Sequence, residues 1–253
     1  MIDIIAFDGD DTLWHCERLY AQAAGKFKRL FSNCHDPEWV GQRLSEIEIA
    51  NLSDYGYGFK SFALSMIETA IEISDGPVPS DLLRQTIDIA RQIQRADVQL
   101  VTFAEDTLAE LSATYPLMLI TKGDFIEQAR KVTGSGLAKY FRSTEIIGEK
   151  SAETYQEVLA RRHVNPRRFL MVGDSLRSDI LPVIELGGKA VRIPSSPTWS
   201  HETMDSSIVG KDGYYEIESL AQLPALVKSL NKGHVLTSRG LDGRPSSPRR
   251  SDG

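Results

Sequence analysis

The fold is decided near the start of the chain, by the stretch Ile4-Ile5-Ala6-Phe7-Asp8-Gly9-Asp10-Asp11-Thr12-Leu13-Trp14. A short apolar run that ends in a polar turn is typical of a buried parallel strand. Two carboxylates, Asp8 and Asp10, follow this strand directly. Open α/β folds bind their ligands just beyond the carboxyl ends of such strands. Asp8 and Asp10 are therefore candidate site residues: they can share a divalent cation while one attacks an electrophile and the other transfers a proton.

Three later apolar segments, 117–120, 146–148 and 169–172, also end in polar residues. The residues of interest at these ends are, in chain order, Thr121 and Lys122, then Lys150, then Asp174 and Asp179. Each of these residues lies at or just beyond the end of a predicted strand, where open α/β folds bind their ligands.

Together the four segments resemble the haloacid dehalogenase superfamily, over roughly residues 1 to 230. The family signature, a hydrophobic strand followed by Asp-x-Asp-x-Thr, is matched by Asp8, Asp10 and Thr12. The later family motifs are a Ser or Thr after the second strand, a lysine, and Gly-Asp-(x)4-Asp. They are matched in the family's order by Thr121, Lys150 and the segment 173–179.

The resemblance implies catalysis through an aspartyl-phosphate. Asp8 would be the nucleophile, and Asp10 would act as general acid in the first step and as general base in the second. The groups expected to bind the phosphate are Gly9, Thr121, Lys122 and Lys150. Asp11 and Asp124 lie beside the motifs but match no catalytic position, and we expect them to cap turns.

The resemblance also implies a Mg²⁺ site, because this ion prefers oxygen ligands and retains several waters. The residues assigned to it are Asp8, Asp10 through its main-chain carbonyl, Asp174 and Asp179. Asp179 is expected to orient Lys150 or a water on the metal rather than to bind the ion directly.

The order of patterns along the chain predicts an α/β fold with a helical insertion. Helical periodicity marks the segments 16–31, 38–51, 57–73 and 80–94, and residues 15–96 resemble the family's helical cap. Residues 1–14 and 97–233 would form a Rossmann-like core, with a parallel sheet between helices on both faces. Its further elements are predicted as helices at 108–114, 125–133, 154–163, 178–186 and 220–230, and as strands at 117–121, 144–148, 169–173 and 190–193.

Composition bears on the binding partners and the cellular location expected for the protein. The 253 residues carry a net charge of −6, which argues against general binding of nucleic acid. The chain shows no leader-like start and no apolar run of membrane-spanning length, so we expect a cytoplasmic protein. Residues 234–253 are rich in Ser, Pro, Gly and Arg and are predicted to be a disordered tail.

The predicted function is a Mg²⁺-dependent phosphatase that acts on a small phosphorylated metabolite. A sugar-phosphate mutase would use the same core residues, and a binding or regulatory member of the family is a further alternative. A binding role has no need of the full set Asp8, Asp10, Thr121, Lys150, Asp174 and Asp179. The substrate stays open among nucleotides, sugar phosphates and phosphoglycolate.

Overall fold

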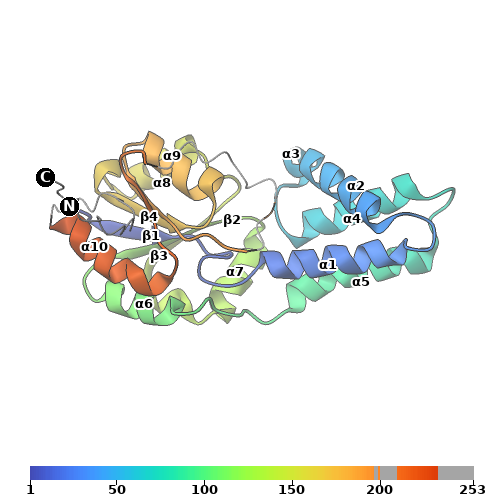
Figure 1. Ribbon diagram of the computed structural model, residues 1–253, viewed down its shortest axis with the longest axis horizontal. Helices are drawn as coiled ribbons and strands as arrows, with labels where there is room; N and C mark the ends of the chain where they lie inside the picture. Colours follow the sequence, from blue (N-terminus) through green and yellow to red (C-terminus); the bar gives the residue numbers. More distant parts are fainter. Residues whose placement is uncertain (197–198, 200–209, 233–253) are drawn as a thin grey trace, which may run out of the picture.

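The computed structural model describes residues 1–196, 199 and 210–232. Its centre is a six-stranded sheet in the order β3-β2-β1-β4-β5-β6, in which every neighbouring pair is parallel (Figure 1). The strands are β1 (Ile4–Phe7), β2 (Leu117–Lys122), β3 (Phe141–Ile147), β4 (Phe169–Gly173), β5 (Lys189–Arg192) and β6 (Tyr214–Glu216). The predicted α/β sheet with helices on both faces is therefore confirmed.

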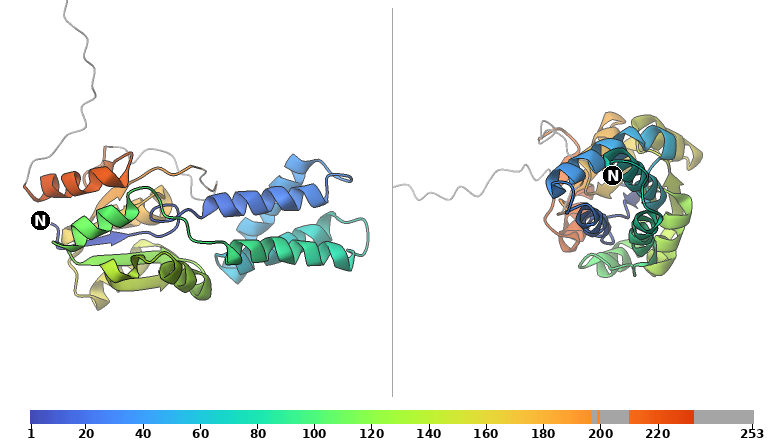
Figure 2. Two further views of the ribbon diagram at one scale, coloured as in Figure 1. Left: turned by 90° about the horizontal axis from the view of Figure 1, so that it is seen from below. Right: turned by 90° about the vertical axis from the view of Figure 1, so that its right-hand side faces the viewer.

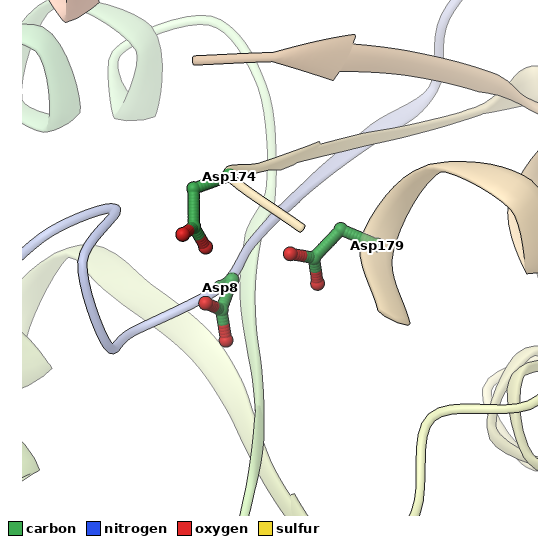
Figure 3. Close-up of side chains that lie close together, drawn as sticks. All are labelled: Asp8, Asp174 and Asp179. Carbon is green, nitrogen blue, oxygen red and sulfur yellow. The ribbon is translucent and has the colours of Figure 1, made fainter. Parts of the chain in front are cut away.

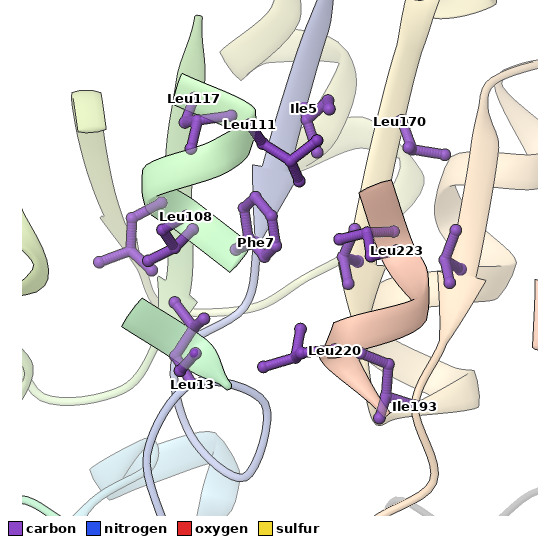
Figure 4. Close-up of a cluster of buried hydrophobic side chains, with 14 of the residues drawn as sticks. Ile5, Phe7, Leu13, Leu108, Leu111, Leu117, Leu170, Ile193, Leu220 and Leu223 are labelled. Carbon is purple, nitrogen blue, oxygen red and sulfur yellow. The ribbon is translucent and has the colours of Figure 1, made fainter. Parts of the chain in front are cut away.

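The side chains of β1 alternate between the two faces of the sheet, and each set packs against a different group of helices. Ile5 and Phe7 point to the face covered by α6 (Ala104–Ser112) and α10 (Leu223–Asn231), where they join a buried apolar cluster (Figure 4). Ile4 and Ala6 point to the opposite face, which is covered by α8 (Ala152–Arg161) and α9 (Leu181–Glu185). Because both faces are buried, β1 reads as a continuous apolar run rather than as an alternating one.

A bundle of helices lies to one side of the sheet layer (Figures 1 and 2). It comprises α1 (Glu17–Leu30), α2 (Pro37–Ala50), α3 (Leu52–Tyr55), α4 (Phe59–Ile73) and α5 (Ser80–Arg95), and we call it the helical unit. It has its own apolar core, in which Phe27, Val40 and Met66 are fully buried. The chain enters and leaves it side by side, since the His15 amide donates to the Gln99 carbonyl at 2.9 Å.

Some elements differ from the sequence predictions. The predicted helix 178–186 is a π-helical turn, Leu176–Ile180, followed by the short α9. Pro182 lies in the first turn of α9, where its missing amide hydrogen is tolerated. Strand β6 was not predicted, because three residues at a sheet edge carry almost no periodic signal.

The predicted tail, 234–253, lies outside the described residues. Among those that the structure describes, no helix combines the length and the apolar character that crossing a bilayer requires.

Candidate active site

Three carboxylates converge at the carboxyl edge of the central strands (Figure 3). Asp8 follows β1, Asp174 follows β4, and Asp179 lies in the turn after β4. One oxygen from each lies within 4.8 Å of the others. The parallel register pairs Phe7 with Val172, so that β1 and β4 deliver Asp8 and Asp174 side by side. This part of the predicted site is assembled as strand topology requires.

The cluster depends on a glycine at the end of β4. A Cβ on Gly173 would lie only 2.3 Å from the Asp179 carboxyl carbon, so a larger residue would displace that side chain. The Ser175 amide donates to Asp179 at 3.1 Å, which holds the carboxylate over the strand end. Gly9 is restricted in the same way, because a Cβ there would lie 2.4 Å from the Trp14 ring.

Lys150 supplies the positive charge inside this cluster. Its Nζ lies 2.5 Å from Oδ1 of Asp8 and 2.6 Å from Oδ1 of Asp179, and the residue is almost fully buried. Burial alone lowers the pKa of a lysine, but the negative charges of Asp179 and Asp8 raise the pKa of Lys150 well above its usual value. Lys150 is therefore a fixed cation next to the predicted nucleophile.

One lysine does not balance three carboxylates. Burial is the largest cause that raises the pKa of Asp8, and the charges of Asp179 and Asp174 raise it further against the attraction of Lys150. Burial and Asp179 likewise raise the pKa of Asp174 to about 7. The clustered donors are all carboxylate oxygens, the ligand type of Mg²⁺, Mn²⁺ and Ca²⁺, and a divalent cation would offset their repulsion. The residues present therefore fit such an ion.

Thr121 and Lys122 lie at the end of β2, beside the carboxylate cluster in the sheet. Thr121 is buried, and its Oγ1 donates to the Gln128 side chain at 3.1 Å. Lys122 donates to the Ser178 hydroxyl at 2.8 Å, and its Nζ lies 4.2 Å from the centroid of the Tyr57 ring. The Lys122 charge is thus held at the boundary with the helical unit rather than directed to bulk solvent.

The Asp10 carboxylate lies outside the three-carboxylate cluster and has partners of its own. It accepts hydrogen bonds from Trp14 Nε1 at 2.7 Å, from Gln128 Nε2 at 2.8 Å, and from Lys131 Nζ at 3.0 and 3.1 Å. Burial raises its pKa, but the charge of Lys131 and these hydrogen bonds outweigh burial and lower the pKa of Asp10 below its usual value. The metal role assigned to the Asp10 main chain stays a prediction.

Glu127, Gln128 and Lys131 on α7 (Phe125–Gly134) are site residues that the sequence analysis missed. Glu127 is 2% exposed, accepts from Lys131 at 2.8 Å and from the Tyr20 hydroxyl at 3.1 Å, and also accepts from the Phe59 amide at 2.8 Å. It therefore joins α7 to two elements of the helical unit. The available signal was the i, i+4 pair of Glu127 and Lys131, which is usually a solvated helix face.

Asp11 and Asp124 act as caps, as predicted. Asp11 accepts from the amides of Cys16 and Glu17 at 2.9 Å each, at the start of α1. Asp124 accepts from the Glu127 amide at 3.0 Å at the start of α7.

A cavity of about 300 Å³ lies between the carboxyl edge of the sheet and the helical unit. Its lining contains the predicted site residues other than Gly9, which are Asp8, Asp10, Thr121, Lys122, Lys150, Asp174 and Asp179. The strands thus bring the predicted nucleophile, cations and carboxylates to the floor of one cavity, and helices α1 to α4 supply the opposite wall.

Comparison with known proteins assigns this architecture. The family model of haloacid dehalogenase-like hydrolases matches residues 2–187. The chain belongs to this family. A haloacid dehalogenase-like family hydrolase from Xanthomonas campestris is 33% identical, with a TM-score of 0.83 over 92% of this chain and 93% of that one. No curated protein matches the chain.

More distant structures share the fold of this haloacid dehalogenase-like hydrolase. The L-2-haloacid dehalogenase from Xanthobacter autotrophicus with chloropropionic acid covalently bound is 16% identical, with a TM-score of 0.63 over 91% of this chain and all of that one. A predicted phosphoglycolate phosphatase from Haemophilus somnus is 14% identical, with a TM-score of 0.59 over 89% and 98%. The fold alone therefore does not separate dehalogenation from phosphate hydrolysis.

Two carboxyl groups of the hydrolase face the cavity from the helical unit. Burial raises the pKa of Glu48, on α2, from 4.5 to about 7. Burial is also the largest cause that raises the pKa of Glu17, on α1, to about 8, and the negative charges of Asp11 and Glu48 add to it. Both groups are thus easier to protonate in the folded protein than in an unfolded chain.

Glu48 should make the stability of the protein depend on pH. Its folded-state pKa is raised, so its contribution to stability is fully present below pH 4.5 and is lost as the pH rises through about 7. In a Glu48→Gln variant the side chain at this position is neutral at every pH. We expect its melting temperature, relative to the native protein, to rise by about 3 °C or more between about pH 5 and about pH 8. Calorimetry at both pH values tests this. If the melting temperatures of the two proteins differed by the same amount at both pH values, the raised pKa of Glu48 would be contradicted.

Proposed function

We propose that this haloacid dehalogenase-like hydrolase is a Mg²⁺-dependent phosphatase that hydrolyses a small phosphorylated metabolite through an aspartyl-phosphate. The observation that carries the proposal is the set of acidic groups around Asp8. Asp174 and Asp179 lie within 4.8 Å of it as a cation-binding cluster, and Asp10 adds a separate carboxylate to the same cavity. Phosphate transfer has a use for both features, because it needs charge neutralisation and a proton donor for the leaving oxygen.

In the first step, a carboxylate oxygen of Asp8 attacks phosphorus and the bond between phosphorus and the leaving oxygen breaks. Asp10 gives its proton to that oxygen, so that a neutral alcohol departs. In the second step, water attacks the phosphorus of the aspartyl-phosphate while Asp10 takes a proton from the water. Inorganic phosphate leaves, and the carboxylate of Asp8 is restored.

Asp10 must change its protonation state between these steps. With Lys131, Gln128 and Trp14 as partners, its lowered pKa favours the carboxylate that the second step requires. An incoming phosphate is itself anionic, and a negative charge nearby favours the protonated form of a carboxyl group. We propose that the substrate thereby promotes the acid form needed in the first step.

Lys150, Thr121 and the carboxylate cluster each have a different role in stabilising the negative charge of the reacting phosphate. Lys150, bonded to Asp8, offsets the charge of the nucleophile and of the approaching phosphate. Thr121 and the amides after it lie at the end of β2 and would donate to phosphate oxygens, the Thr121 hydroxyl in exchange for its present bond to Gln128. Asp8, Asp174 and the Asp10 carbonyl would hold Mg²⁺, with Asp179 beside them. When bound, the ion would supply positive charge to the phosphate oxygens.

We also propose that the helical unit acts as a cap over the site, as its position across the cavity supports. A cavity of about 300 Å³ suits a small molecule rather than a polymer. The absence of nucleic-acid binding and the cytoplasmic location stay predictions.

A haloacid dehalogenase is the second candidate, because several structural neighbours carry that activity in their names. In dehalogenation the corresponding aspartate attacks carbon and expels halide, which is stable without a proton. Neither a second carboxylate for proton transfer nor a cation-binding cluster is then needed. The groups around Asp8 therefore favour the phosphatase.

Metal dependence and leaving group distinguish the two activities in one experiment. We expect the purified protein to hydrolyse p-nitrophenyl phosphate, to lose this activity in EDTA, and to regain it with Mg²⁺. We expect 2-chloropropionate to be left intact, measured as chloride release. Chloride release that persists in EDTA would overturn the phosphatase proposal and the role given to Asp10.

A further inference from the structure

The wall that the helical unit contributes to the cavity carries only negative charge. Of the described residues from α1 to α4 that line it, Glu17 and Glu48 are acidic and none is Lys, Arg or His. The lysines of the lining, Lys122 and Lys150, lie on the opposite floor, which belongs to the core. The floor also carries carboxylates, including the Asp8, Asp174 and Asp179 cluster. Both lysines thus lie on the floor, and among the charged groups of the described residues the wall of the helical unit contributes carboxyl groups alone.

Neither carboxyl group of this wall has a partner within the described part of the chain, where no hydrogen bond or ion pair involves the side chain of Glu17 or Glu48. Burial raises the pKa values of both groups, and the neighbouring negative charges raise that of Glu17 further. A half-buried carboxyl group without a partner costs free energy, and a bound ligand that supplies the missing partner recovers it.

Two further observations point to the same kind of ligand. Ser61, on α4, lines the cavity and is 4% exposed, and its Oγ has no hydrogen-bond partner among the residues that the structure describes. Tyr20 and Phe62 also line it, with their ring centroids 5.3 Å apart. Aromatic faces attract cations, and a hydroxyl oxygen accepts a hydrogen bond from an ammonium group. Carboxyl groups, aromatic rings and a free hydroxyl together are chemistry suited to an amine.

We infer that the substrate is a phosphate monoester whose leaving group carries a positively charged amine, which binds between Glu17 and Glu48. This inference rests on the proposed phosphatase function. The phosphate end would lie at Thr121, Lys122 and Lys150, and the ammonium end at the opposite wall. A leaving group with a carboxylate or a second phosphate would meet like charge there, which opposes binding.

A matched series of phosphate monoesters tests the inference directly. Alkyl phosphates of roughly two to five carbons, each ending in an amine, a hydroxyl or a carboxylate, differ mainly in terminal charge. At the best chain length we expect kcat/KM for the amine to exceed that for the hydroxyl by about tenfold or more, with the carboxylate lowest. Equal rates, or preference for the carboxylate, would overturn the inference.

Variants at the wall assign the preference to its residues. Glu48→Gln and Glu17→Gln should each lower the amine-to-hydroxyl ratio of kcat/KM by about tenfold. Glu48→Lys should shift the preference toward the carboxylate ester, a gain that misfolding cannot produce. Glu46→Gln is the matched control, because Glu46 lies on the same helix but is exposed and paired with Arg43. Ratios unchanged in both glutamine variants would overturn the assignment.

The outcomes separate this inference from the function on which it rests. If p-nitrophenyl phosphate is hydrolysed with Mg²⁺ but no amine preference is found, the phosphatase stands and the inference about the leaving group fails. If the protein hydrolyses none of these phosphate esters, the proposed function fails and the inference fails with it.

Discussion

Replacing Asp8 with asparagine should lower turnover of p-nitrophenyl phosphate by about 10³-fold or more, because an amide is a poor nucleophile. The amide has nearly the shape of the carboxylate, and Lys150 keeps Asp179 as a partner at 2.6 Å. The change also removes one negative charge from a crowded cluster, so the fold should be retained. Steady-state kinetics and a melting curve measure the two effects.

The matched control is Asp3→Asn. Asp3 lies just before β1, at the amino end of the strand and thus away from the cavity. It is exposed and paired with Arg168. The same chemical change there should leave turnover unaltered. If Asp8→Asn kept more than a few per cent of native activity, Asp8 would not be the nucleophile.

Replacing Lys150 with methionine should lower turnover by about 10²-fold or more, the scale of one preorganised charge contact. Methionine fills much of the same volume but leaves Asp8 and Asp179 without their shared cation. The loss should appear in kcat as well as in KM, because the charge acts on the nucleophile and on the transferring phosphate.

Two measurements make the Lys150 result interpretable. Circular dichroism shows whether the variant folds, since removing one member of a buried ion pair destabilises a protein. Lys139→Met is the control, because Lys139 forms an exposed ion pair with Glu105 away from the cavity. Native turnover in a folded Lys150→Met protein would refute the electrostatic role.

Much of the site was predictable from the sequence, because parallel strands place their carboxyl ends at one edge. That rule unites Asp8, Thr121 and Asp174 although more than a hundred residues separate the first two. Lys150, which contacts Asp8 in the structure, was assigned from the resemblance to the family rather than from this rule. The core strands were recognisable because burial on both faces leaves unbroken apolar runs.

The remainder of the site depends on contacts between elements, which periodicity does not report. On α7, Glu127 and Lys131 are buried while Phe125 and Ile126 are exposed, the reverse of the usual amphipathic pattern. Glu17 and Glu48 lie on different helices, and only the packing of the helical unit brings them to one cavity. Polar residues at helical spacing are normally assigned to solvent, so each of these was missed.

Glu127 gives the seating of the helical unit a direct effect on the chemistry of the core. Its carboxylate is shared among the Tyr20 hydroxyl, the Phe59 amide and Lys131, and Lys131 in turn holds Asp10. Glu127 and Asp10 therefore share one ammonium group, and the other two partners of Glu127 belong to the helical unit. A single buried carboxylate thus connects two elements of the helical unit, through Lys131, to the Asp10 carboxylate in the core.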